Sequence, residues 1–274
     1  MSESFSEDHR QGADRPLDRV DGLDAQALTA VASRARQPAG ADDVCYVDEL
    51  VQAALAADRT AVTQIASQMI AVGMRAEEIA DHYVPEAARK LGEMWSDDRL
   101  GFVAVTVGSA RLQSLLRELG PEWRADLVTL PTGPSLLVLV ASDISHTLGA
   151  TVLTGQLRRL GMSVCLMVGA RPEDLGPVLR QRQFDAVMVS ASLGESLGTL
   201  RRQVDAIRMA IALPPPIVLG GTIVTTEGLT SQEILARTGV DVVTNDLNEA
   251  LALCGLAVPE RAGRRDAARR GLTA

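Results

Sequence analysis

The spacing of apolar residues divides the chain into two regions that meet near residue 120. From about Val44 to Leu119, apolar side chains recur every three or four residues, as in amphipathic helices. This spacing predicts four helices with short connections, and such helices fold as an all-α bundle. The residues expected to face inward are Val47, Leu50, Val51, Ala54, Leu55, Val62, Ile65, Met69, Ile70, Ile79, Tyr83, Ala87, Leu91, Trp95, Phe102, Val105, Leu112, Leu115, Leu116 and Leu119.

Residues with special backbone preferences mark the ends of these helices. Asp58 suits the N-cap of the second helix, and Gly73 suits its C-terminal end. Pro85 is expected to bend or split the third helix, because proline cannot donate a backbone hydrogen bond. The β-branched stretch from Phe102 to Val107 is unusual for the start of a fourth helix.

After residue 134, short apolar runs alternate with helical segments. Strands are expected at Leu136–Val140, Ser163–Val168, Ala186–Val189, Ile217–Leu219 and Val240–Val243. Helices are expected at Gly149–Leu160, Pro172–Gln181, Leu197–Ile211, Thr230–Arg237 and Leu247–Leu253. Continuous β-branched runs alternating with helices indicate a buried parallel sheet with right-handed crossovers. The predicted fold is a four-helix bundle followed by a Rossmann-like (flavodoxin-like) domain with a five-stranded parallel sheet.

The remaining segments are expected to connect or flank these two domains. The predicted parts are a polar, acidic and disordered arm (1–42), the bundle (43–120), a linker rich in Pro and Gly (121–134), the Rossmann-like domain (135–258) and a basic, disordered tail (259–274). The arginines of the tail either are solvated or touch DNA. Both tails could contact a partner.

Composition and charge narrow the classes of function. The chain has 274 residues and a formal charge of −8, which argues against nucleic acid or an anionic membrane as the main partner. Its three cysteines are far apart and form no CxxC pair, so neither a disulfide framework nor a zinc site is indicated. No apolar run approaches the ~20 residues that span a membrane, and the protein is expected in the cytoplasm.

Small, hydroxyl and imidazole side chains follow three of the predicted strands. His146 and Gly149 come after the first strand, and Gly220-Gly221-Thr222 after the fourth; the loop after the third holds Ser190, Ser192 and Gly194. Ligands of open α/β sheets bind at the carboxyl ends of the strands, and glycine lets a ligand approach the backbone closely. No loop matches GxGxxG or a P-loop, and no paired carboxylates or Ser-His-Asp set is evident, which lowers the expectation of an enzyme.

Together these loops resemble a known signature for cobalamin. His146-Thr147-Leu148-Gly149, Ser190-Ala191-Ser192 and Gly220-Gly221 are similar in order and spacing to the cobalamin-binding pattern DxHxxG, SxL, GG. The resemblance implies that His146 is the lower axial ligand of cobalt and that Ser190 bonds the buried base of the cofactor. It also implies that the glycines make room for the nucleotide tail. Imidazole is a suitable ligand for such a metal.

The helical half resembles the bundle that caps the cofactor in cobalamin-dependent regulators. The segment Leu91–Asp98, with Trp95, is similar to that bundle, and Phe102–Gly108 with Arg111-Leu112-Gln113 is most similar to the PpaA/AerR regulators of photosynthetic bacteria. A related domain has been called a haem-for-cobalamin sensor. The resemblance implies a non-enzymatic antirepressor acting on a PpsR/CrtJ-type repressor of photosynthesis and tetrapyrrole genes, with Trp95 near the upper ligand and DNA reached only indirectly or weakly.

The chain departs from the family pattern at two places. Ile144 stands where the signature has an acid, and a carboxylate there would hydrogen-bond the other imidazole nitrogen and raise the basicity of His146. Val105-Thr106 stands where adenosylcobalamin photoreceptors carry a Glu-His pair. A hydroxo, aquo or methyl upper ligand is therefore favoured over adenosyl. Two alternatives stay open: a corrinoid carrier subunit of a methyltransferase system, and a haem-binding sensor.

Overall fold

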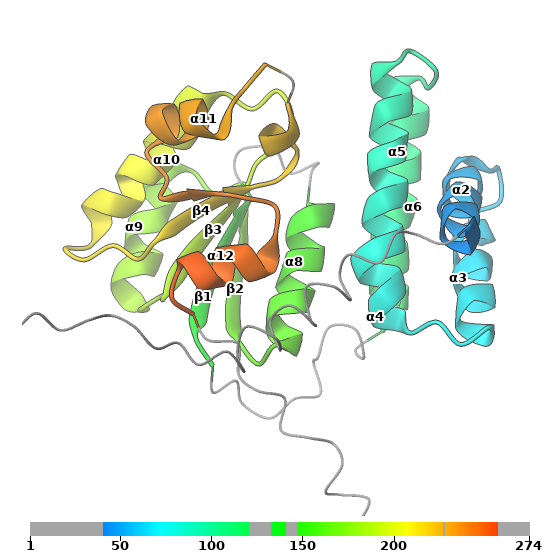
Figure 1. Cartoon of the computed structure of the whole chain (residues 1–274), viewed down its shortest axis with the longest axis horizontal. Coiled ribbons are helices and arrows are strands. Elements are labelled where there is room, and N and C mark those ends of the chain that lie inside the picture. Colours follow the sequence, from blue (N-terminus) through cyan, green and yellow to red (C-terminus); the bar gives the residue numbers. More distant parts are fainter. Residues whose placement is uncertain (1–40, 121–132, 141–146, 227, 257–274) are drawn as a thin grey trace, which may run out of the picture. The chain divides into compact units, whose positions relative to one another are not determined.

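The computed structural model describes residues 41–120, 133–140, 147–226 and 228–256 (Figure 1). Most of the expected arm, most of the linker and all of the basic tail lie outside the described residues.

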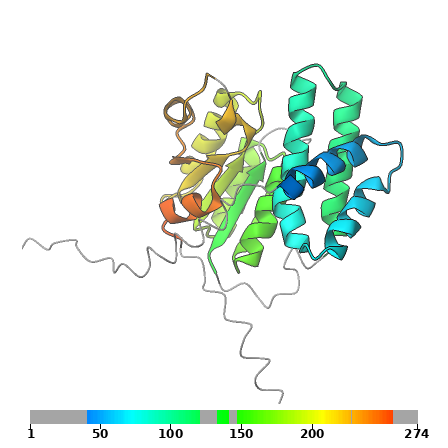
Figure 2. The ribbon, with the colours of Figure 1, turned by 45° about the vertical axis from the view of Figure 1, so that its right-hand side comes forward.

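The N-terminal part of the described chain is helical (Figure 2). Its elements are α2 (Ala41–Leu55), α3 (Ala61–Ala71), α4 (Ala76–Glu78), the π-helix η1 (Ile79–Tyr83), α5 (Val84–Ser96) and α6 (Phe102–Glu118). Leu50, Met69, Tyr83, Leu91 and Leu112 are fully buried and belong to one apolar core. The apolar spacing in the sequence therefore identified the centre of this core correctly.

A change in helical hydrogen bonding takes the place of the expected break at Pro85. Helical residues run without interruption from Ala76 to Ser96, and the π-helical turn immediately precedes α5, which has Pro85 in its first turn. Because Pro85 has no backbone N–H, the carbonyl of Asp81 receives no α-helical hydrogen bond from it. The widened turn fits this loss, since π-turns form where the regular ladder is interrupted.

Four details of the predicted bundle are wrong. The N-cap of α3 is Thr60, while the Asp58 carboxylate accepts hydrogen bonds from the Thr60 N–H and hydroxyl, both at 2.8 Å. Three residues expected inside are exposed, namely Ile70 (49%), Trp95 (47%) and Phe102 (69%). Ile70 is turned about 100° from the buried Met69 along the helix. Trp95 and Phe102 lie at helix ends, where spacing alone does not show whether a neighbour covers them.

The C-terminal part is a five-stranded parallel sheet with order β2-β1-β3-β4-β5. Its strands are β1 (Ser135–Val140), β2 (Ser163–Val168), β3 (Ala186–Ser190), β4 (Ile217–Gly220) and β5 (Val242–Val243). Its helices are α8 (Leu148–Arg159), α9 (Pro172–Gln181), α10 (Leu197–Ala210), the 3-10 turn η2 (Thr222–Thr225), α11 (Ser231–Thr238) and α12 (Leu247–Leu253). The predicted fold class is confirmed. β5 begins two residues later than predicted.

Both faces of the sheet are covered, as expected for a doubly wound fold. Leu136 and Val138 of β1 share a core with α8 and α12, whereas Leu137 and Leu139 share another with α9, α10 and α11. This alternation explains why β1 reads as a continuous apolar run. Among the described residues, no helix is both long and apolar enough to cross a membrane.

Candidate functional site

The carboxyl edge of the sheet brings together the ends of β1, β3 and β4. Ser190, the last residue of β3, pairs in register with Val140 of β1 on one side and with Gly220 of β4 on the other. The strand order changes direction between β1 and β3, and such a switch point is where open α/β sheets bind ligands. The predicted serine and glycine positions therefore meet at the expected edge.

The predicted metal ligand, His146, lies outside the described residues, as do Asp143, Ile144 and Ser145. The structure describes both ends of this connection: β1 ends at Val140, and Thr147 is the N-cap of α8. In the sequence, His146 is therefore the residue before the N-cap of α8.

Thr147 fixes the start of α8 and contacts the helical part. Its carbonyl oxygen accepts hydrogen bonds from the N–H of Thr151 at 2.9 Å and from the Thr151 hydroxyl at 2.8 Å. The side-chain amide of Gln113, on α6, donates a 3.4 Å hydrogen bond to the Thr147 hydroxyl. In contrast, a Cβ atom added at Gly149 would meet no described atom within 4 Å, so this glycine leaves open space at the edge.

The two glycines at the end of β4 are required by neighbouring backbone. Gly221 has φ = 102°, and a Cβ atom there would lie 2.2 Å from the carbonyl oxygen of Ala191. A Cβ atom at Gly220 would lie 2.9 Å from the carbonyl oxygen of Thr244. Both positions therefore need glycine for the packing of the loops themselves. A further role in admitting a cofactor stays a prediction.

Sequence reasoning missed Asn245 as a member of this loop network. Its side-chain oxygen accepts a 2.7 Å hydrogen bond from the N–H of Gly221, and its side-chain amide donates to the Gly221 carbonyl at 3.2 Å. The hydroxyl of Thr222 accepts a 2.8 Å hydrogen bond from the N–H of Leu193. The available signal was an amide residue two positions after the last strand, where its side chain can replace backbone pairing.

The two serines of the β3 loop have hydroxyls that remain available. Ser190 and Ser192 are half-buried, and neither hydroxyl bonds to another described residue. The Ser192 carbonyl accepts from the N–H of Glu195 at 3.1 Å, which closes the turn after the strand. Half-buried hydroxyls of this kind are suited to hydrogen-bond an entering ligand.

The helix that follows the histidine loop is also part of the bundle core. Val152 of α8 belongs to that core, and Leu148 packs against it. At the other end of α8, the Arg159 guanidinium pairs with the Asp81 carboxylate of η1, with 9% and 28% of their side chains exposed. Burial raises the pKa of Asp81, and the charge of Arg159 opposes that shift. One helix therefore connects the sheet edge with the bundle.

Trp95 is the predicted cofactor contact that lies on the helical part, at the end of α5. Its indole is half exposed and so is free to contact a ligand. Within the described ranges, no three His, Cys, Asp or Glu side chains gather in a group that could hold a metal ion.

Comparisons with known proteins show the family and the kind of domain. Residues 134–253 match the family model of the B12 binding domain. An uncharacterized 20.5 kDa protein of Rhodobacter capsulatus, encoded in the bchF-crtJ intergenic region, is 37% identical over 172 residues, which cover 63% of this chain and 88% of that protein. The monomethylamine corrinoid protein of Methanosarcina barkeri has a similar fold, with a TM-score of 0.58, 16% identity and coverage of 76% of this chain and 95% of that one.

Proposed function

Because the chain belongs to the family of the Rhodobacter capsulatus bchF-crtJ protein and carries a B12 binding domain, we propose that it is a cobalamin-binding regulator without enzymatic activity. It acts in the cytoplasm on a transcriptional repressor of the PpsR/CrtJ type and reaches DNA through that partner. The genomic setting of the relative, beside crtJ, supports this choice of partner.

The residues at the carboxyl edge fit a corrinoid. His146 would supply the lower axial ligand of the cobalt. One protein ligand would be enough, because the corrin ring itself supplies four equatorial nitrogens. Ser190 would bond the buried base, Ser192 would contact the cofactor as well, and Gly149 would leave room for the tail. When bound, cobalamin supplies a cobalt ion whose upper ligand can exchange, here a hydroxo, aquo or methyl group in preference to adenosyl.

The observation that carries the regulatory part of the proposal is the shared helix α8. His146 lies two residues before this helix in the sequence. Within α8, Val152 belongs to the bundle core and Arg159 pairs with Asp81. A displacement of the histidine on binding would be passed to the bundle through a packed helix, since packed cores repack between discrete arrangements. Cofactor state would then shift the population of two arrangements of α8 on the bundle.

The regulatory proposal is tested with the purified repressor bound to a fluorescent operator duplex. Adding the cobalamin-loaded chain is expected to lower the fraction of bound duplex, whereas the cofactor-free chain should have a weaker effect. The His146→Ala variant serves as the matched control. Equal effects of the loaded chain, the free chain and the variant would contradict regulation by the cofactor.

The alternative of a corrinoid carrier predicts a different outcome. A carrier passes methyl groups repeatedly from a donor to an acceptor through its cobalt. If the loaded chain, supplied with a methyl donor and its methyltransferase, sustains many turnovers, the non-enzymatic reading is wrong. We expect no turnover beyond the first loading.

A further inference from the structure

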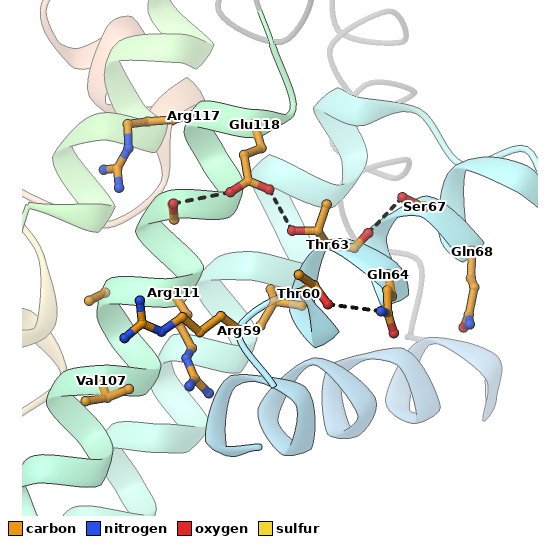
Figure 3. Close-up of a pocket in the computed structure, with 13 residues that line it drawn as sticks. Arg59, Thr60, Thr63, Gln64, Ser67, Gln68, Val107, Arg111, Arg117 and Glu118 are labelled. Atoms are coloured by element: carbon orange, nitrogen blue, oxygen red, sulfur yellow. Dashed lines mark hydrogen bonds between the residues drawn. The ribbon is translucent and has the colours of Figure 1, made fainter. Parts of the chain in front are cut away.

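A groove runs between α3 and α6 in the helical part, away from the residues assigned to the cofactor (Figure 3). Its volume is about 1060 Å³, and it is lined by Arg59, Thr60, Val62, Thr63, Gln64, Ser67, Gln68, Val107, Ala110, Arg111, Ser114, Arg117 and Glu118. None of these residues belongs to the predicted cofactor site. The groove is therefore a candidate binding site that is separate from the cofactor site.

Side-chain hydrogen bonds hold the walls of the groove in place. The Thr63 hydroxyl of α3 donates to the Glu118 carboxylate of α6 at 2.6 Å, and the Ser114 hydroxyl donates to the same carboxylate at 3.3 Å. Arg111 donates to the carbonyl oxygen of Ala54 at 2.9 Å and also to that of Ala56, which satisfies the end of α2. Figure 3 shows the bond that joins the two walls.

The charge of the groove is opposite to that of the whole chain. Three arginines line it against a single acid, Glu118, while the chain carries a formal charge of −8. Arg59 and Arg117 are exposed, and neither makes an ion pair within the described part of the chain. A negatively charged partner would be repelled by most of the surface and attracted here.

The α3 wall has the composition of a protein interface. No residue of α3 carries a charge, and its exposed face presents Gln64, Ser67 and Gln68. Exposed apolar side chains accompany it: Val107 of α6 lines the groove and is 43% exposed, and Ile70 of α3, outside the groove, is 49% exposed. Centres of protein interfaces are depleted of charged residues other than arginine, whereas nucleic-acid surfaces carry a dense set of cations.

We propose that the α3–α6 groove binds an acidic segment of a partner protein. The carboxylates of that segment would pair with Arg59 and Arg117, which arginine does well through its fork of donors. The amide and hydroxyl groups of α3 would hydrogen-bond its backbone. This site does not depend on cobalamin.

The test uses a random-peptide phage library selected on the full-length chain. Selected peptides are expected to be enriched in Asp and Glu. The best of them, labelled with fluorescein, should bind Arg59→Glu/Arg117→Glu about tenfold more weakly than the unaltered chain, as expected when steering charges are reversed. Arg182→Glu/Arg202→Glu is the matched control, because both of its arginines are exposed and lie outside the groove.

Three results would overturn the proposal. The first is a set of selected peptides without enrichment in Asp and Glu. The second is equal peptide affinity for the unaltered chain, the groove variant and the control variant. The third is a labelled DNA duplex that binds the unaltered chain tightly and loses binding only in the groove variant. Arg59→Gln/Arg117→Gln, which removes charge without reversing it, replaces the glutamate variant if that protein does not fold. Both groove variants should keep the cobalamin spectrum of the unaltered chain, which separates this test from that of the proposed function.

Discussion

Three glycines at the carboxyl edge of the sheet differ in what a methyl group would meet. At Gly221 it would meet the Ala191 carbonyl, at Gly220 the Thr244 carbonyl, and at Gly149 open space. The family signature treats the three alike, as positions that admit a ligand. The structure distinguishes them: Gly220 and Gly221 allow neighbouring loops to pack closely, whereas Gly149 faces open space.

Gly221→Ala is expected to destabilise the fold. Its positive φ alone costs about 1–3 kcal/mol for a residue with a side chain, and the contact with Ala191 adds to that cost. Urea unfolding measures the loss. Stability equal to that of the unaltered protein would contradict the close approach of Gly221 to the Ala191 carbonyl.

Gly149→Ala is expected to leave stability intact and to weaken cobalamin binding. The new methyl group meets no described atom and lies in the first turn of α8, so the free energy of unfolding should stay unchanged or rise by up to about 1 kcal/mol. Cobalamin affinity, measured by spectral titration, should fall because the methyl group occupies the space left for the tail. Unaltered affinity would exclude Gly149 from the cofactor site.

Among the elements, α8 shows how far sequence alone could lead. Its range was predicted to within one residue, as were those of β2 and α9, because continuous apolar runs and flanking Gly or Pro define them. Its membership of the bundle core could not be predicted, since periodicity gives one apolar face and does not say which elements share it. The same limit explains why Trp95 and Phe102 were expected inside.

The ion pair between α8 and η1 leads to a prediction that depends on pH. Arg159→Met keeps the aliphatic packing but leaves the Asp81 carboxylate without its partner, so its pKa, already raised by burial, should rise further. At neutral pH the free energy of unfolding of the variant should be lower by roughly 1–3 kcal/mol. This is less than the cost of breaking a fully buried pair, because the Asp81 side chain is 28% exposed.

The sign of the pH dependence follows from that raised pKa. Between the unfolded value, near 3.8, and the higher folded value, the folded state holds more protons, so stability falls as pH rises through this window. The loss in Arg159→Met should therefore shrink toward acidic pH, where Asp81 is protonated in both states. Urea unfolding at several pH values checks this, with Asp81→Asn/Arg159→Met as the control that removes the dependence. A loss that is constant with pH would show that Asp81 is not its source.

At the scale of the whole molecule, the sequence predicted the fold class and the meeting of Ser190 and Gly220 at one edge of the sheet, because parallel strands bring the residues at their ends to the same edge. It could not predict the loop network around Asn245 or the groove between α3 and α6, since these depend on tertiary contacts between distant segments. The two proposed sites lie on different parts of the molecule: the cofactor site is at one edge of the sheet, whereas the groove is a separate surface of the bundle.

The central claim is that cobalamin binds at the carboxyl edge with His146 as its lower ligand. The most direct measurement is the absorption spectrum of the full-length chain after mixing with hydroxocobalamin or haem, removal of free cofactor, and comparison with His146→Ala. We expect retained corrinoid bands in the visible and near ultraviolet, with altered bands and lower affinity in the variant. A Soret band from retained haem without retained corrinoid, or a variant whose cobalamin spectrum and affinity are unchanged, would contradict the claim.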